Sequence, residues 1–213
     1  ILYCSGDADS LPLQSQSIDV LHSSMALQWC SSPSFGIAEI TRVLSTGGSA
    51  QLAIMLDSSL YELRDAWENI GITPRINNFF SQQQWLQATQ DLQIEQINKN
   101  SNVKINIQQQ VRSFTEWHSS SLDMLRALKL IGAATKYNSM EIAENSHLQL
   151  SPVTVSNAIS KQELIELDKQ MQRQVCALSE QYQQRNAGDK GEGNRGLPLT
   201  YQILFLTIQK TQS

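Results

Sequence analysis

Residues 17–56, SIDVLHSSMALQWCSSPSFGIAEITRVLSTGGSAQLAIML, decide the fold class. A short apolar run at 18–22 predicts a buried strand, and a second run at 51–56 predicts another. Between them, two serines followed by Pro33 predict the start of a helix, because proline is favoured at the first helical position. The helix is expected to end near Leu44. Two buried strands joined through a helix indicate an α/β fold with a parallel pair.

A turn precedes this strand–helix–strand unit. GDADSLPL, residues 6–13, contains glycine, two aspartates and proline, which all favour irregular backbone. The chain opens with ILYCS, residues 1–5, which reads as the end of a strand. Because no cap or turn precedes that strand and the first residue is not methionine, the simplest interpretation is that the chain is a piece of a longer one.

Downstream, four pairs of residues have the spacing of helix N-caps. These pairs are Ser59 with Glu62, Ser81 with Gln84, Ser120 with Asp123, and Ser160 with Glu163. The helices they predict cover residues 59–71, 81–86, 122–134 and 160–184. Apolar residues predict further strands at 92–97, 103–107 and 199–210. Residues 136–159 and 188–196 are expected to be loops.

The predicted architecture is an α/β sheet that carries a helical insertion before an antiparallel last strand. Residues 1–110 are expected to form the main part of the core. Residues 111–196 form the helical insertion, and residues 197–213 form the last core strand.

Composition narrows the class of protein. Of 213 residues, 40% are hydrophobic and the net charge is -4, which excludes a disordered acidic chain and disfavours a globally basic nucleic-acid binder. No run of about 18 apolar residues occurs and no signal-peptide pattern opens the chain, so neither a membrane span nor export is expected. The 3 cysteines and 3 histidines lack the spacing of a zinc site, which favours a reducing, cytoplasmic compartment, buried or inert thiols and no metal.

Two motifs invite a chemical interpretation. The glycines at 188–196 do not predict a phosphate cradle, because a helix precedes them and a strand follows, the reverse of a phosphate-binding loop. Asp7 and Asp9 leave three alternatives open: acid–base or metal chemistry, a local turn role, or acceptance of a hydrogen bond from a ligand amino group. The last is favoured because an acidic residue past the carboxyl end of a strand lies where open α/β sheets bind ligands.

The segments GDADSLPL, SIDVLHSSMALQWC and AEITRVLSTGGSAQLAI resemble, in order and spacing, the middle of a class I S-adenosylmethionine-dependent methyltransferase. In that superfamily the acidic turn contacts adenine, and the next strand ends beside the sulfonium of the cofactor. The helix and the Gly47–Gly48 turn lead to the following strand. The resemblance implies a Rossmann-like sheet and assigns cofactor binding to Gly6, Asp7, Ala8, Ser23, Ser24 and Met25.

A closer resemblance is to the malonyl-[acyl-carrier protein] O-methyltransferases of biotin synthesis. It rests on ALQWC (26–30), SLYELRDAW (59–67), SLDMLRALKLIGA (121–133) and LPLTYQ (197–202). The resemblance covers most of the chain and weakens over 98–112 and 136–195. The ELR and TYQ segments also resemble a mitochondrial methyltransferase-like arginine hydroxylase that assists complex I assembly, which remains the alternative.

The chain departs from these families in one large respect. Their glycine-rich loop after the first strand, and the acidic residue that ends the second strand, are both missing. By resemblance, the first two β-α units are absent, so the chain alone is expected to bind the cofactor poorly and to be inactive. Strand 18–22 would then be an unpaired apolar edge.

The resemblance implies methyl transfer to the free carboxylate of a malonyl thioester on acyl-carrier protein, or of malonyl-CoA. That carboxylate is already ionised near neutral pH, so no general base and no catalytic residue are expected. An arginine is the residue suited to binding the carboxylate, and basic residues on one helix face could dock an acidic carrier protein. The predicted substrate-binding residues are Gln28, Trp29, Arg75, Arg126, Lys129 and Tyr201. Neither nucleic acid nor a membrane is an expected partner.

Overall fold

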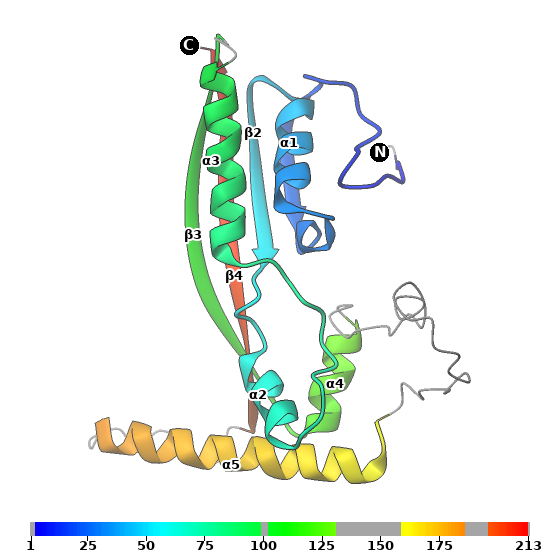
Figure 1. Ribbon diagram of the computed structural model, residues 1–213, viewed down its shortest axis with the longest axis vertical. Coiled ribbons are helices and arrows are strands. Elements are labelled where there is room, and N and C mark those ends of the chain that lie inside the picture. Colours follow the sequence, from blue (N-terminus) through cyan, green and yellow to red (C-terminus); the bar gives the residue numbers. More distant parts are fainter. Residues whose placement is uncertain (1–2, 99–101, 131–158, 186–195, 213) are drawn as a thin grey trace, which may run out of the picture. The chain divides into compact units, whose positions relative to one another are not determined.

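The computed structural model describes residues 3–98, 102–130, 159–185 and 196–212. Its strands are β1 (Ile18–Ser24), β2 (Leu44–Met55), β3 (Val103–His118) and β4 (Leu197–Gln212). Its helices are η1 (Leu27–Trp29), α1 (Pro33–Val43), α2 (Tyr61–Asn69), α3 (Gln82–Asn98), α4 (Ser121–Leu130) and α5 (Lys161–Arg185). These elements form two compact units (Figure 1). Unit 1 comprises Ile1–Ser59, Asn78–Phe114 and Thr200–Ser213, and unit 2 comprises Leu60–Asn77 and Thr115–Leu199.

The sheet has the strand order β1-β2-β4-β3. β1 pairs with β2 in parallel, whereas β4 pairs with β2 in antiparallel orientation. The sheet is therefore mixed and open, which confirms the predicted α/β class and the antiparallel last strand. β1 lies at one end of the strand order, and its Val20 side chain is 61% exposed.

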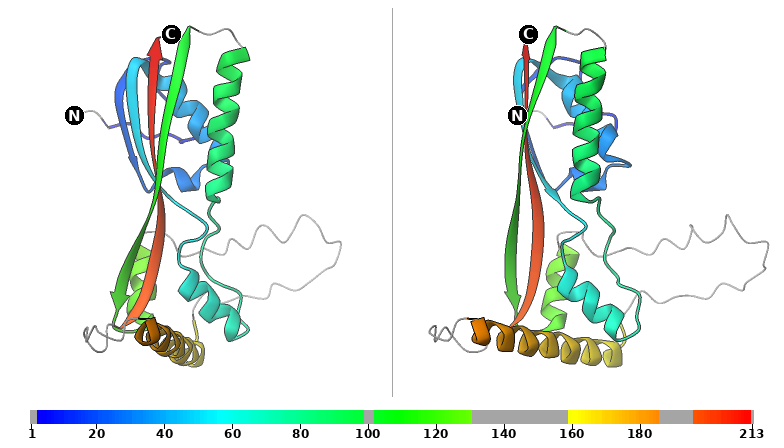
Figure 2. Two further views of the ribbon diagram at one scale, coloured as in Figure 1. Left: turned by 90° about the vertical axis from the view of Figure 1, so that its left-hand side faces the viewer. Right: turned by 60° about the vertical axis from the view of Figure 1, so that its left-hand side comes forward.

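The core of unit 1 lies between one face of the sheet and the helices α1 and α3 (Figure 2). Alternate residues of β2 face this core, as do alternate residues of β4, because side chains of a strand point to opposite faces in turn. The buried members from the strands include Ala50, Leu52, Ile54, Leu204, Leu206 and Ile208. α1 contributes Ile37 and Ile40, and α3 contributes Trp85, Ala88 and Leu92.

The start of α1 confirms the sequence prediction. Pro33 is the first helical residue, and the Ser32 side chain accepts a hydrogen bond from the backbone N–H of Phe35 at 3.3 Å. The two glycines after the helix lie inside β2 rather than before it. Gly47 has a φ of +95°, and a side chain at Gly48 would come within 3.0 Å of the carbonyl oxygens of Ile18 and Asp19. They form an irregularity in the β1–β2 register, not a separate turn.

Two strand predictions are wrong. Residues 92–97 belong to α3, which continues to Asn98. Trp85, Ala88 and Leu92 recur with helical spacing and are buried, while Ile94 is 53% exposed, so the helical period outweighs the short apolar run. Residues 3–5 form no strand. The strand expected at 103–107 does begin at Val103 and runs on to His118.

One of the four predicted caps is also wrong. The Ser59 hydroxyl exchanges hydrogen bonds with the backbone of Gln202, donating to the carbonyl at 3.1 Å and accepting from the N–H at 2.9 Å. α2 instead begins after Leu60, which has a left-handed φ of +61°. The Ser59 hydroxyl therefore links the segment that follows β2 to β4, and it does not cap α2.

The other three caps form as predicted. The hydroxyls of Ser81, Ser120 and Ser160 accept hydrogen bonds from backbone N–H groups three residues later, at 3.2, 3.3 and 3.1 Å.

In unit 2, α5 contacts α2 and α4. Leu167 and Met171 of α5 are fully buried, and Asp168 accepts hydrogen bonds from the backbone and hydroxyl of Ser121 at 2.8 and 2.9 Å.

Some predictions lie outside the described residues. They are residues 136–158 of the first predicted loop, residues 188–195 of the second, the end of the helix predicted over 122–134, and His147, one of the 3 histidines. Among the helices that are described, none is long and apolar enough to cross a membrane.

Lys210 of β4 closes the carboxyl end of α1. Its side chain is only 7% exposed, and Nζ donates to the carbonyl oxygens of Thr41 and Leu44 at 3.0 and 2.8 Å. Burial lowers the pKa of this ammonium group. The two hydrogen bonds satisfy carbonyls that the end of a helix otherwise leaves without partners.

We predict that Lys210→Met destabilises the protein by about 1–3 kcal/mol, because it leaves two buried carbonyl groups without a donor. Chemical denaturation monitored by circular dichroism measures the change. Lys161→Met, at an exposed position, is the control and should have little effect. A Lys210→Met variant as stable as the parent chain would contradict this role.

Candidate functional site

The carboxyl end of β1 is held in an unusual backbone conformation. Met25 directly follows the strand and has a φ of +54°, which is rare for a residue with a side chain. Its N–H donates to the carbonyl of Ala53 on β2 at 2.8 Å. Ser23 and Met25 are half-buried and Ser24 is exposed. Strained backbone of this kind concentrates at functional sites, because surrounding contacts must hold it in place.

Gln28 lies in η1, just beyond this strand end, and is only 5% exposed. Its Nε2 donates to the carbonyl of Met25 at 2.7 Å. Its Oε1 is buried and accepts from no described residue. A buried acceptor without a donor is costly, so this oxygen is suited to a ligand that brings an N–H or O–H group.

The predicted turn over 6–13 is confirmed, and it presents Asp7. The backbone N–H of Ser10 donates to the Asp7 carbonyl at 3.1 Å, and that of Asp9 donates to Asp7 Oδ1 at 3.0 Å. The Asp7 side chain is exposed. A Cβ atom at Gly6 would collide with the ring of Pro12, so glycine is required there. Ala8 packs against the core and anchors the turn.

Asp9 joins the turn to the segment before α1. Its Oδ2 accepts from the backbone N–H of Ser31 at 2.8 Å, while its Oδ1 is buried without a described donor. Hydrogen bonds from the Ser31 side chain and backbone lower the pKa of Asp9. Burial, and secondarily the Asp9 charge, raises the pKa of the neighbouring Cys30 thiol to about 12. Cys30 is thus an inert thiol, as predicted, whereas Cys4 and Cys176 are exposed.

Two side chains of α1 hold the far end of the turn, and we name Glu39 and Arg42 the α1 clasp. Glu39 Oε2 accepts from the backbone N–H of Leu11 at 2.8 Å. The Arg42 guanidinium donates to the carbonyls of Leu11 and Leu13 at 3.0 and 2.9 Å, and to Glu39 at 2.8 Å. The hydrogen bond from Arg42 lowers the pKa of Glu39, so the clasp stays charged at neutral pH.

Neither the anchoring role of Asp9 nor the α1 clasp is predicted by a local pattern in the sequence. The one local signal was the spacing of an acid and a base three residues apart on a predicted helix, which typically indicates a surface ion pair. Their contacts with the turn join residues 22 to 31 positions apart, which no local pattern reveals.

Two predicted substrate residues of unit 1 have contrasting surroundings. Trp29 is 48% exposed and meets the ring of Phe79 edge to face, with centroids 5.6 Å apart. It is therefore not an ordinary core residue. Tyr201 on β4 is 9% exposed, so its ring is part of the packed interior.

The three predicted basic residues lie in unit 2. Arg126 and Lys129 are exposed on α4. Arg75 follows α2, its guanidinium lies 5.8 Å from the centre of the Trp67 ring, and its Nη2 lies 3.4 Å from Glu163 Oε1. The predicted cofactor residues thus lie in unit 1, and the predicted basic residues lie in unit 2.

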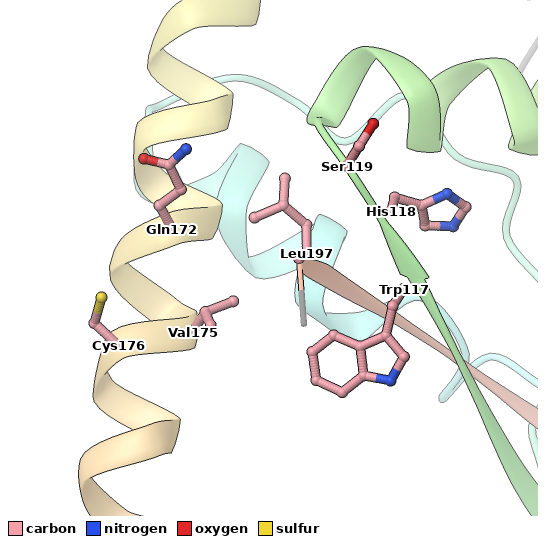
Figure 3. Close-up of a pocket in the computed structure, with 8 residues that line it drawn as sticks. Trp117, His118, Ser119, Gln172, Val175, Cys176 and Leu197 are labelled. Atoms are coloured by element: carbon pink, nitrogen blue, oxygen red, sulfur yellow. The ribbon is translucent and has the colours of Figure 1, made fainter. Parts of the chain in front are cut away.

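Unit 2 also contains a pocket of about 770 Å³ that sequence analysis did not predict. Its lining is Trp117, His118, Ser119, Gln172, Val175, Cys176, Gly196 and Leu197. The side chain of Val175 points from α5 toward the strands that carry Trp117 and Leu197, whereas the His118 ring points away from α5 (Figure 3). His118 is 9% exposed, with the carboxylates of Glu116 and Asp123 at 3.9 and 3.8 Å. No His, Cys, Asp and Glu side chains gather as a metal site in the part of the chain that is described.

The amino-acid sequence of this chain is similar to those of known methyltransferases. The family model described as a methyltransferase domain matches residues 1–52, which include β1, α1 and the acidic turn. The chain is 30% identical over 206 residues to the malonyl-[acyl-carrier protein] O-methyltransferase of Alcanivorax borkumensis, an alignment that covers 96% of this chain and 55% of the relative. With the enzyme of the same name from Marinomonas sp. the identity is 25% over 211 residues, covering 99% of this chain and 63% of the relative.

The fold has its counterpart among solved structures. The crystal structure of a putative methyltransferase from Bacillus halodurans superposes with a TM-score of 0.50 at 11% identity, covering 99% of this chain and 78% of that one. The chain spans about half the length of the curated relatives that it matches. The first 52 residues are thus similar to a methyltransferase domain, the fold is similar to that of a putative methyltransferase, and the named relatives are malonyl-[acyl-carrier protein] O-methyltransferases.

Proposed function

We propose that this chain takes part in methyl transfer from S-adenosylmethionine to the free carboxylate of a malonyl thioester on acyl-carrier protein, an early step of biotin synthesis. The observation that carries the proposal is the alignment of 96% of the chain with a relative that has this name. Because the chain spans about half of that relative, the activity is proposed for the chain together with the remaining length.

One acceptor beside the carboxyl end of β1 and another in the acidic turn suit the cofactor. The adenine amino group and the ammonium group of S-adenosylmethionine are hydrogen-bond donors, which need acceptors. Gln28 Oε1 is a buried acceptor without a described donor, and the Asp7 carboxylate is exposed. We assign Asp7 to the adenine amino group and Gln28 to a second donor of the cofactor or substrate. Ser23, Ser24, Met25, Gly6 and Ala8 shape the surrounding backbone.

The chemistry requires alignment more than proton transfer. Bound S-adenosylmethionine supplies an electrophilic methyl group on a sulfonium. One carboxylate oxygen of the malonyl group forms the new O–CH₃ bond while the S–CH₃ bond breaks, and no proton moves. A carboxylate with an ordinary pKa of about 4 is already ionised near neutral pH. The role of the protein is to hold two reactants in line, a contribution that reaches effective molarities on the order of 10⁵ M.

The exposed face of α4 suits an acidic carrier protein, and we name its residues Leu122, Arg126, Lys129 and Leu130 the α4 strip. Leu122 and Leu130 are 41% and 88% exposed, which is unusual for leucine on an amphipathic helix. The opposite face, with Met124 and Leu128, is fully buried. Two cations flanked by exposed apolar side chains offer both charge complementarity and a surface to bury.

The proposed activity is tested with two forms of the protein. One is the 213-residue chain, and the other, the completed form, joins it to the segments of the Alcanivorax borkumensis relative that the alignment leaves uncovered. Each is mixed with malonyl-carrier protein and S-adenosylmethionine, and the acyl-carrier product is weighed by mass spectrometry. We expect the completed form to add one methylene mass. No gain, despite cofactor binding by the completed form, would overturn the proposed acceptor.

For the α4 strip, we predict that the double variant Arg126→Ala with Lys129→Ala raises the KM for malonyl-carrier protein about tenfold, equivalent to about 1.4 kcal/mol of binding energy. The KM for malonyl-CoA should change little, because malonyl-CoA lacks the carrier surface. Lys169→Ala with Arg173→Ala is the matched control, since it removes one lysine and one arginine from exposed positions of α5. An equal rise in KM for both substrates, or an equal rise in both double variants, would show that the α4 strip does not dock the carrier protein.

A further inference from the structure

Arg75 lies on an aromatic platform inside unit 2. Its guanidinium carbon is 5.8 Å from the centre of the Trp67 ring, which is fully buried. The arginine side chain itself is 25% exposed, so one part of it remains accessible. Stacking on an aromatic face fixes the plane of a guanidinium group, and such a plane matches a carboxylate bidentately.

The hydrogen-bonding capacity of Arg75 is largely unused. A guanidinium has five N–H donors. Among the described residues its hydrogen-bond partner is Glu163, with Nη2 and Oε1 3.4 Å apart, which is longer than the usual 2.7–3.2 Å. Nη1 is buried and donates to no described acceptor. A buried cationic donor without an acceptor is costly, so this group is poised to accept a ligand that carries one.

Glu163 cannot supply that acceptor without disrupting its own helix. Its Oε2 accepts from the backbone N–H of Ser160 at 2.7 Å, and its own N–H donates to the Ser160 hydroxyl at 3.1 Å. This reciprocal pair caps the start of α5. The hydrogen bonds from Ser160, with the Arg75 charge as a smaller cause, lower the pKa of Glu163. The Glu163 carboxylate therefore stays charged. One of its oxygens belongs to the helix cap, and the other makes the long contact with Arg75.

We propose that Arg75 binds the free carboxylate of the malonyl thioester, and that Glu163 is a built-in competitor which weakens this binding. The inference rests on the proposed function, for which it names the residue that recognises the substrate carboxylate. An incoming carboxylate pairs with Nη1 and Nη2 and replaces the contact from Glu163, whose Oε2 remains on Ser160. A thioester without a free carboxylate, such as an acetyl thioester, has nothing to offer this group.

Substitutions of Arg75 and Glu163 should change the KM for malonyl-carrier protein in opposite directions. This distinguishes a carboxylate-binding site from an ion pair that only stabilises the fold. Arg75→Lys should raise the KM for malonyl-carrier protein in the completed form by tenfold or more, with little change in kcat. Glu163→Gln keeps an amide oxygen for the Ser160 cap but removes the competing charge, so it should lower that KM about threefold to tenfold. Glu166→Gln, on the same helix and 3.7 Å from Lys169, is the matched control and should change neither value.

A direct binding measurement distinguishes failure of this inference from failure of the proposed function. Malonate is titrated into the full 213-residue chain while NMR follows the Arg75 Nε–H signal. The signal should shift with malonate, more tightly in Glu163→Gln, and not with an equal concentration of acetamide. If malonate binds but the completed form transfers no methyl group, the Arg75 carboxylate site is supported and the proposed methyltransferase function is overturned.

The reverse pattern would overturn the inference alone. If the completed form methylates malonyl-carrier protein but Arg75→Lys and Glu163→Gln leave the KM unchanged, Arg75 is not the carboxylate site. If both variants weaken malonate binding, Arg75 and Glu163 form a structural pair. Misfolding cannot produce the gain expected of Glu163→Gln, so that variant tests the inference even if Arg75→Lys is unstable.

Discussion

The register of β2 with its two neighbours is the constraint on which unit 1 depends. Residues Ser49–Ala53 pair with β1 on one side in parallel and with β4 on the other side in antiparallel orientation. A change of one residue would turn the core-facing side chains of the strand to the opposite face. An irregularity at Gly47 and Gly48 precedes this paired stretch: Gly47 has a φ of +95°, and a Cβ atom at Gly48 would lie 3.0 Å from backbone carbonyl oxygens of β1.

That register places the functional backbone as well as the core. The carbonyl of Ala53 on β2 holds Met25 in its left-handed conformation, and Met25 in turn accepts from Gln28. On the other edge of β2, β4 carries Lys210 to the end of α1. α1 is thereby fixed at its carboxyl end, while the α1 clasp ties it to the acidic turn. One helix covers the core and also positions the aspartates.

Local patterns in the sequence predicted much of this arrangement. The strand–helix–strand order, the proline at the start of α1, three of four caps and the antiparallel last strand are all confirmed. They depend on residues close together in the chain, where spacing and propensity act. The cap predicted at Ser59 is wrong because its hydroxyl bonds to the backbone of Gln202, 143 positions away. The strand predicted at 92–97 is wrong because the buried face of a helix outweighs a short apolar run.

The candidate site was predicted less completely, for the same reason. Resemblance selected Asp7, Met25 and Gln28, but only the folded chain reveals that Gln28 has an acceptor without a donor. It also reveals that Arg75, chosen for its chemistry alone, lies on Trp67 with most of its donors unused. Asp9, the α1 clasp and Lys210 act through partners 22 to 169 positions away, so no local pattern could identify them.

The central claim is that the acidic turn and the end of β1 bind the adenosine part of the cofactor. Calorimetric titration of the completed form with S-adenosylhomocysteine tests it most directly, with Asp7→Ala and the control Asp19→Ala, at an exposed position of β1. The account predicts that Asp7→Ala weakens binding about tenfold or more, whereas Asp19→Ala leaves it unchanged. Equal affinity of Asp7→Ala and the parent protein would contradict the account.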